Sequence, residues 1–212
     1  MDANSICQNS PIFPQSLRRH LGEEAPEQVV LLGNGDLLNR PSLALFCSRK
    51  YPGSVILQTY DLMKELRQRE EVTVIGGFQS PMERECLHLL LKGVASVIVC
   101  PARAIEKFRI PADCKPALEG GRLLYLSPFV EKPRRPTAQT ALFRNRFVAA
   151  LAEVSFVAYA SVGGTLESLS GEIAGWGRQI YTHDDEHTVI LVKLGARVSL
   201  PLPSLPPVPS SC

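Results

Sequence analysis

The sequence has little net charge and no long hydrophobic run, and both shortages limit what the protein can be. Lysine and arginine total 23 against 21 aspartates and glutamates, for a formal net charge of +2. Any nucleic-acid binding must therefore come from local arginines rather than from a global basic field. No apolar run approaches the ~18 residues of a membrane span, and residues 1–10 lack the layout of a secretory signal. We expect a cytoplasmic protein that does not enter a membrane.

Paired cysteines are also missing. The six cysteines are scattered and no Cys-x-x-Cys occurs, which excludes a zinc knuckle and a thioredoxin motif. Cys47 and Cys100 end apolar runs and are expected to be buried, as free thiols in a reducing compartment. Residues 183–187 read His-Asp-Asp-Glu-His, but no third ligand follows at a regular spacing. We predict no metal site and no cofactor.

Catalytic motifs are absent too. The sequence contains no Gly-x-Ser-x-Gly, no His-Glu-x-x-His and no Walker A loop. Glu83, Glu85 and Glu167 stand where helices are expected to begin, and carboxylates stabilise a helix dipole there without any catalytic role. We therefore name no catalytic residue and favour a binding protein over an enzyme.

Short apolar runs alternate with segments of helical spacing along most of the chain. Strands are predicted at 43–47, 72–75, 95–100, 123–126, 154–160 and 179–182, and helices at 55–66, after Pro81, and at 137–153, 166–176 and 188–194. Uniformly apolar strands are buried on both faces, and their alternation with helices favours a parallel sheet. The sequence predicts an α/β fold: a Rossmann-like, doubly wound, mostly parallel sheet in three α/β/α layers.

Composition divides the chain into three parts. Residues 1–28 are polar, hold several prolines and show no clear period, so we expect a poorly ordered lead-in. Residues 29–199 carry the alternating pattern and form the predicted Rossmann-like domain. Residues 200–212 are rich in proline and serine, which is typical of an extended, flexible tail.

Small and polar residues recur just after the predicted strands. The informative ones are Ser48, Arg49, Gly76, Gly77, Gly163, Gly164 and Thr165. In an open parallel sheet these turns gather at one edge, where ligands bind. Glycines let the backbone approach a phosphate, and a helix beginning near Thr165 offers free N–H groups to an anion. One Gly-Gly pair typically makes only a tight turn, but two pairs beside Ser48-Arg49 favour an anion or nucleotide site.

A second cluster, Arg144-Asn145-Arg146, interrupts an otherwise apolar helix. Arginine forks bind phosphate in bidentate fashion, and Asn145 can orient them. Two arginines on a helix are usually a solvated face, but the flanking Phe143 and Phe147 and the nearby Gly-Gly pair favour phosphate contact.

These residues resemble a known family. Three segments are similar to motifs of the DprA/Smf DNA-processing proteins. They are residues 32–38, which read Leu-Gly-Asn-Gly-Asp-Leu-Leu, residues 43–49, which end in Ser48-Arg49, and Arg144-Asn145-Arg146. The resemblance covers about residues 30–197. It implies an extended Rossmann fold, a homodimer, binding of single-stranded DNA and delivery of that strand to the RecA recombinase. By position, it places these residues in the pocket: Ser48, Arg49, Gly76, Gly77, Arg144, Asn145, Arg146, Gly163, Gly164 and Thr165.

The chain also departs from that family. Cys47 stands where the family has the glycine of its Gly-Ser-Arg turn, and residues 78–85 replace the family's Ala-Arg-Gly-Ile-Asp segment. The same superfamily holds the LOG-type phosphoribohydrolases, whose Pro-Gly-Gly-x-Gly-Thr-x-x-Glu motif is similar at Gly163-Gly164-Thr165. Here Glu167 comes one residue early, which turns it about 100° around a helix. A nucleotide-processing or nucleotide-sensing protein is the alternative, and a partner-binding domain with a degenerate pocket is a third interpretation.

Overall fold

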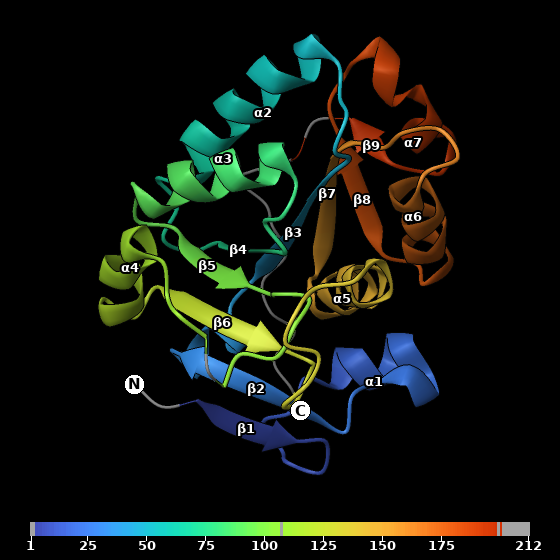
Figure 1. Cartoon of the computed structure of the whole chain (residues 1–212). Helices are drawn as coiled ribbons and strands as arrows, with labels where there is room; N and C mark the ends of the chain where they lie inside the picture. The colour runs from blue at the N-terminus through green and yellow to red at the C-terminus, as the bar shows by residue number, and fades with distance from the viewer. Residues whose placement is uncertain (1–2, 107, 199, 201–212) are drawn as a thin grey trace.

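The computed structural model describes residues 3–106, 108–198 and 200, and a nine-stranded sheet runs through these residues (Figure 1). The strand order across the sheet is β1-β2-β6-β5-β4-β3-β7-β8-β9. The strands are β1 (Asn4–Cys7), β2 (Gln28–Gly33), β3 (Ser42–Cys47), β4 (Thr73–Gly76), β5 (Ser96–Val99), β6 (Leu123–Ser127), β7 (Val154–Tyr159), β8 (Gln179–Thr182) and β9 (Arg197–Val198).

The sheet is parallel except at one edge. The pairs from β6 through β3 to β9 are all parallel, whereas β2 runs antiparallel to β6 and β1 antiparallel to β2. The chain lays β4, β5 and β6 outward on one side of β3 and then returns to place β7, β8 and β9 on the other side. This confirms the predicted doubly wound, mostly parallel sheet, with its reversal of strand order at β3.

Helices cover both faces of the sheet and complete the three layers (Figure 1). One face is packed by α2 (Gly53–Leu66), α3 (Pro81–Leu91) and α4 (Lys115–Glu119). The other face is packed by α1 (Gln15–Leu21), α5 (Ala138–Leu151), α6 (Thr165–Gly175) and α7 (Val189–Lys193). Ser80 and Thr137 start α3 and α5 with capping boxes, in which the cap side chain and a residue in the first turn satisfy each other's backbone N–H groups.

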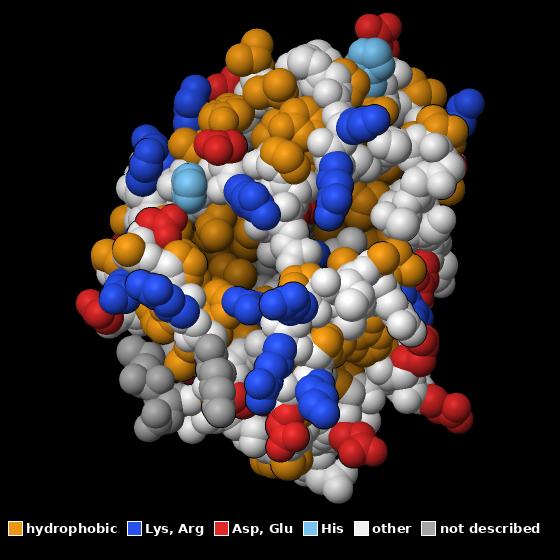
Figure 2. Space-filling view, viewed as in Figure 1, with side chains coloured by type: hydrophobic (Ala, Val, Ile, Leu, Met, Phe, Trp, Pro, Cys, Tyr) orange, Lys and Arg blue, Asp and Glu red, His pale blue; other side chains and the backbone are white. Residues whose placement is uncertain are grey.

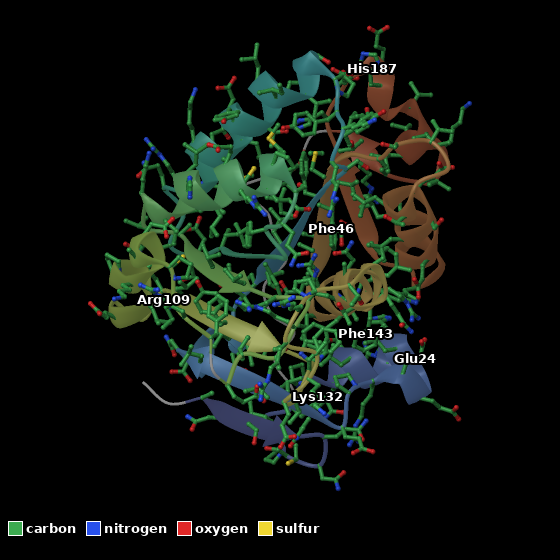
Figure 3. The ribbon with its side chains drawn as sticks, viewed as in Figure 1. Glu24, Phe46, Arg109, Lys132, Phe143 and His187 are labelled. Atoms are coloured by element: carbon green, nitrogen blue, oxygen red, sulfur yellow. The ribbon has the colours of Figure 1, made fainter. Side chains whose placement is uncertain are left out.

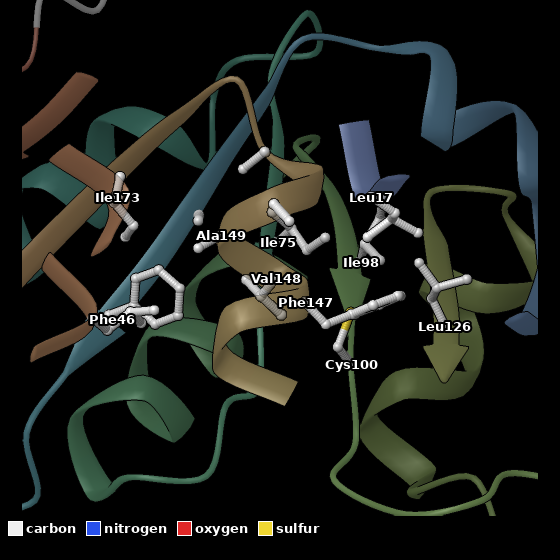
Figure 4. Packing of buried hydrophobic residues seen from close by; sticks show 14 of the residues in the cluster. Leu17, Phe46, Ile75, Ile98, Cys100, Leu126, Phe147, Val148, Ala149 and Ile173 are labelled. Carbon is white, nitrogen blue, oxygen red and sulfur yellow. The ribbon is translucent and has the colours of Figure 1, made fainter. Parts of the chain in front are cut away.

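The core on the α5 side shows why the strands are apolar throughout (Figure 4). Phe46, Ile98 and Leu126 project from three different strands toward this face, and each is at most 1% exposed. Ala149 and Ala150 on α5 are fully buried as well, and their small side chains let the helix lie close to the sheet. Burying one large apolar side chain contributes about 1.5–3 kcal/mol.

The described part of the N-terminal segment, residues 3–28, contains regular secondary structure, including a helix that covers residues 17–21. From residue 3 onward, β1 pairs with β2 and α1 packs against the sheet. Phe13, Leu17 and Leu21 are buried at a spacing of four residues, so the apolar face of α1 and Phe13 just before it pack against the sheet. β1 is an edge strand with mostly exposed side chains, so its sequence shows no alternation.

Other parts of the chain agree with the expectations or lie beyond them. Cys47 and Cys100 are buried free thiols as predicted, and burial raises the pKa of Cys100 to about 12. The predicted tail, 200–212, lies outside the described residues except for Leu200. In the described ranges, the helices are all too short or too polar to cross a membrane.

Candidate functional site

A cleft with a volume of about 400 Å³ opens at the carboxyl edge of the sheet, where β3, β4 and β7 end. It lies at the point where the strand order reverses, because α2 follows β3 onto one face and α6 follows β7 onto the other. Such a divergence leaves a crevice between neighbouring strands. The lining residues are Cys47, Ser48, Arg49, Lys50, Gln79, Ser80, Glu83, Ala141, Arg144, Asn145, Ser161, Gly164, Thr165 and Leu166.

Ser48 ties the two diverging strands together. Its backbone N–H donates to the Tyr159 carbonyl at 3.0 Å, and its Oγ accepts from the Ser161 N–H at 3.1 Å. The register of β3 against β7 shifts between Phe46 and Cys47, just before this serine. Ser48 therefore holds the floor of the cleft in place at the point where the hydrogen-bonded pairing of β3 with β7 ends.

Arg49 and Lys50 stand at the rim. Both are exposed, and their side chains make no hydrogen bond or ion pair with any residue that the structure describes. Two cations without a partner among the described residues can offer their charge to an anion entering the cleft.

Arg144 lies deep in the cleft and is only 3% exposed. Its guanidinium donates to the Cys100 carbonyl at 2.8 Å, to Gln79 Oε1 at 3.2 Å and to Asn145 Oδ1 at 2.9 Å. Burial lowers the pKa of Arg144, and the nearby Glu83 carboxylate opposes that change. An arginine remains charged in proteins, and its fork has more donors than these three bonds engage. Arg144 therefore brings a fixed positive charge to the base of the cleft.

Glu83 is a cleft residue whose part the sequence did not reveal. Its carboxylate accepts from the backbone N–H groups of Cys47 at 3.1 Å, Gln79 at 2.9 Å and Ser80 at 3.2 Å. These bonds join the end of β3 to the start of α3 and offset the negative charge of a carboxylate that is 7% exposed. The Ser80-Pro81-x-Glu83 pattern of a capping box was the available signal, but it gave no sign of the bond to Cys47.

In the loop before α6, the two glycine N–H groups are not free for an anion, contrary to what the sequence had suggested. The Gly163 N–H donates to Glu167 Oε2 at 2.6 Å, and the Gly164 N–H donates to the Ser161 carbonyl at 2.9 Å. Both glycine N–H groups are thus engaged within the loop. Gly164 and Thr165 line the cleft, whereas Gly163 does not, so an anion would meet the first turn of α6 rather than the glycine pair.

Arg146 points away from the cleft. It donates from Nε to Glu172 at 2.8 Å and from Nη1 to Glu24 Oε2 at 2.7 Å. Glu24 follows α1, beside α5 (Figure 3). The residue thus ties the N-terminal segment to α5 and α6, and its guanidinium is held by two carboxylates instead of being free for phosphate.

Six of the ten sequence-predicted residues come together in the cleft, and four do not. The six are Ser48, Arg49, Arg144, Asn145, Gly164 and Thr165, and the four are Gly76, Gly77, Arg146 and Gly163. Gly76 ends β4, and Gly77, which follows it, lies directly beside the Arg144 guanidinium. Among the described residues, no group of three or more His, Cys, Asp or Glu side chains is placed to hold a metal ion. His183 is instead buried, with Nε2 2.8 Å from Thr59 Oγ1.

Comparisons with known proteins agree with this architecture. Residues 4–189 match the family model for DNA recombination-mediator protein A. DNA processing protein A from Streptococcus pneumoniae superimposes with a TM-score of 0.76 at 18% identity, over 92% of this chain and 70% of that one. The Helicobacter pylori protein, whose structure concerns its binding of single-stranded DNA, gives a TM-score of 0.74 at 18% identity, over 92% and 90% of the two chains. A search of curated proteins gives no match.

Proposed function

The chain belongs to the DNA recombination-mediator protein A family, and from this premise we propose that it binds single-stranded DNA in the carboxyl-edge cleft. The observation that carries the proposal is the convergence of three cations, Arg49, Lys50 and Arg144, on one hollow. Because these cations come from two separate segments, a phosphate at the cleft meets positive charge from the rim and from the base. The first-turn N–H groups of α6 add a partial positive charge on a third side.

The fold-related protein from Helicobacter pylori is a single-stranded DNA binder, which supports the same ligand here. Contacts of this kind go to phosphates and carry no base code, so we expect binding with little sequence preference. Because the net charge is only +2, the protein as a whole attracts DNA weakly, and the cations that line the cleft should supply most of the electrostatic affinity.

Titrating a labelled oligothymidylate at several salt concentrations tests the proposal. With about three phosphates neutralised, log K should fall with log salt with a slope of about −2, and Arg49→Ala should reduce that slope by ~0.7. Arg69→Ala is the matched control, because it removes the same charge between α2 and β4, at the opposite edge of the sheet. No retention of the oligonucleotide at low salt, or equal losses in the two variants, would refute the proposal.

The alternative of a nucleotide-processing enzyme receives less support from the geometry. Among the described residues that line the cleft, Glu83 is the one carboxylate, and three backbone N–H groups already hold it. Glu167 bonds to its own loop and is not a lining residue. A nucleoside monophosphate that raises the melting temperature where the oligonucleotide does not, or that releases free base, would favour the enzyme instead.

A further inference from the structure

A second hollow, separate from the cleft, lies between α3 and the segment that follows β5, with a volume of about 310 Å³. Its floor and walls are apolar: Phe78, Val99 and Tyr125 from the sheet side, Leu87 from α3, and Phe108 and Pro111. Figure 2 shows hydrophobic side chains lining this depression, with Lys and Arg side chains around it. The volume is at the lower end of the ~300–1,000 Å³ of small-molecule pockets. We call it the aromatic hollow.

The aromatic hollow adjoins the cleft. Gly77 and Phe78 line the hollow, and the next two residues, Gln79 and Ser80, line the cleft. Phe78 has a positive φ of 49°, which is strained for a residue with a large side chain. This conformation lets the chain present Phe78 to one cavity and Gln79 to the other. A DNA strand that runs from the cleft to the aromatic hollow therefore crosses only the short segment at Phe78 and Gln79.

Positive charge continues on the far side of the hollow. The Arg103 guanidinium lies 4.7 Å from the centre of the Phe108 ring. Beyond Phe108 lies a further depression that shares this ring, and three cations line it, Arg103, Lys132 and Arg134, against two carboxylates, Glu106 and Glu131. The cations of the cleft and those of this depression therefore lie on either side of an apolar, aromatic-lined hollow. Cations along a path with aromatic side chains between them are the arrangement that binds single strands.

The charges inside the hollow decide which part of a strand it accepts. Glu85 and Asp113 reach its rim, with Arg84 and His88, and His88 Nε2 lies 3.1 Å from Asp113. A phosphate there would meet two carboxylates against the single arginine, Arg84, and an apolar floor, which together are unfavourable to it. A nucleobase has apolar faces for the floor and N–H groups, such as N3–H of thymine, that donate to carboxylates. We infer that the aromatic hollow is a nucleobase subsite for the strand whose phosphates lie in the cleft.

This inference rests on the proposed function, and the test separates the two. Binding of an oligothymidylate is compared with binding of a sugar-phosphate strand of the same length that lacks its bases. Phe108→Ala should weaken the intact strand about tenfold, the usual effect of losing one base–aromatic contact, and leave the abasic strand unchanged. Leu87→Trp, which fills the hollow from the half-buried face of α3, should do the same. Thermal melting of both variants reports their folding.

The outcomes are distinct. Selective weakening of the intact strand by either folded variant supports the base subsite. If the variants weaken the intact and the abasic strand equally, or if neither variant weakens the intact strand, the base subsite is refuted. The proposal that phosphates bind in the cleft is not affected by either result. If the unaltered protein binds neither strand, the proposed function itself fails, and the base subsite fails with it.

Discussion

The Arg144 guanidinium occupies the space beside Gly77 in which any side chain would have to stand. A Cβ built on Gly77 would lie 1.5 Å from Nη1 and 1.9 Å from Cζ of Arg144, distances at which atoms overlap. Gly77 does not line the cleft, yet it determines whether the buried arginine can reach it. The sequence predicted close approach of this glycine to a phosphate; in the structure its close approach is to the guanidinium that lines the base of the cleft.

Replacing Gly77 with alanine should displace Arg144 and weaken both folding and DNA binding. The added methyl group overpacks a buried site, which costs about 1–3 kcal/mol. The displaced guanidinium also loses its bonds to Cys100 and Gln79, so oligonucleotide affinity should fall by about tenfold. Denaturant unfolding and a binding titration measure the two effects.

Gly171→Ala is the matched control, because a Cβ there meets nothing within 4 Å and the residue lies within α6. It should stabilise the protein by about 0.5–1 kcal/mol and leave binding unchanged. In a double-mutant cycle, Gly77→Ala should weaken binding little once Arg144→Ala is present, because the two changes remove the same contact. Additive losses would contradict the link between the two residues.

Arg146→Ala should lower stability and spare DNA binding. The guanidinium is held by Glu172 and Glu24 and lies outside the cleft. A partly exposed ion-pair network of this kind is worth about 1 kcal/mol. We expect a lower midpoint in denaturant unfolding, with an unchanged oligonucleotide affinity and salt slope. A loss of affinity as large as that of Arg49→Ala would show that Arg146 leaves its two carboxylates to meet phosphate.

The pair Arg144 and Arg146 shows how far the sequence leads. Strand and helix order follows from periodicity, so the gathering of Ser48, Arg144 and Thr165 at one edge is predictable. The two arginines stand two positions apart on a helix, which turns their side chains ~200° apart. Only one can face the cleft, and which one depends on where Glu172 and Glu24 lie in space. The spacing of residues along the helix cannot predict such partners, because they are distant in the sequence.

Glu167→Gln should strengthen DNA binding at low salt. The Glu167 carboxylate accepts from Gly163, next to the first turn of α6, where it competes with a phosphate for the same positive end of the helix. Glutamine keeps an oxygen for the Gly163 N–H and removes the charge. Affinity should rise about threefold at low salt, and the gain should shrink as salt screens the exposed charges.

The control for this change is Glu70→Gln, which removes an exposed carboxylate at the opposite edge of the sheet and should leave affinity unaltered. An equal rise in both variants would mean that net charge, rather than the α6 terminus, sets the affinity. A fall in Glu167→Gln would mean that the carboxylate orders the loop for the ligand.

Acid should destabilise the fold through His183. The side chain is 8% exposed, its Nε2 lies 2.8 Å from Thr59 Oγ1, and its ring packs edge-on against Phe156. Burial lowers the pKa of His183 from 6.5 to about 4, and the Asp185 carboxylate opposes that change. The folded protein therefore keeps this histidine neutral at pH values where the unfolded chain already binds a proton.

The direction of the effect follows from that difference. Above pH 6.5 the histidine is neutral in both states and its contribution is fully present. As the pH falls from 6.5 toward 4, the unfolded chain gains a proton that the folded state resists, and about 3 kcal/mol of stability is lost. Below pH 4 both states are protonated and the loss levels off. Free energies of unfolding across this range should therefore decline less steeply in His183→Gln than in the unaltered protein. The control is His187→Gln, which changes an exposed histidine of the same loop and should leave the dependence of stability on pH as it is in the unaltered protein. If stability declines in parallel in all three proteins, His183 is not the source of the acid sensitivity.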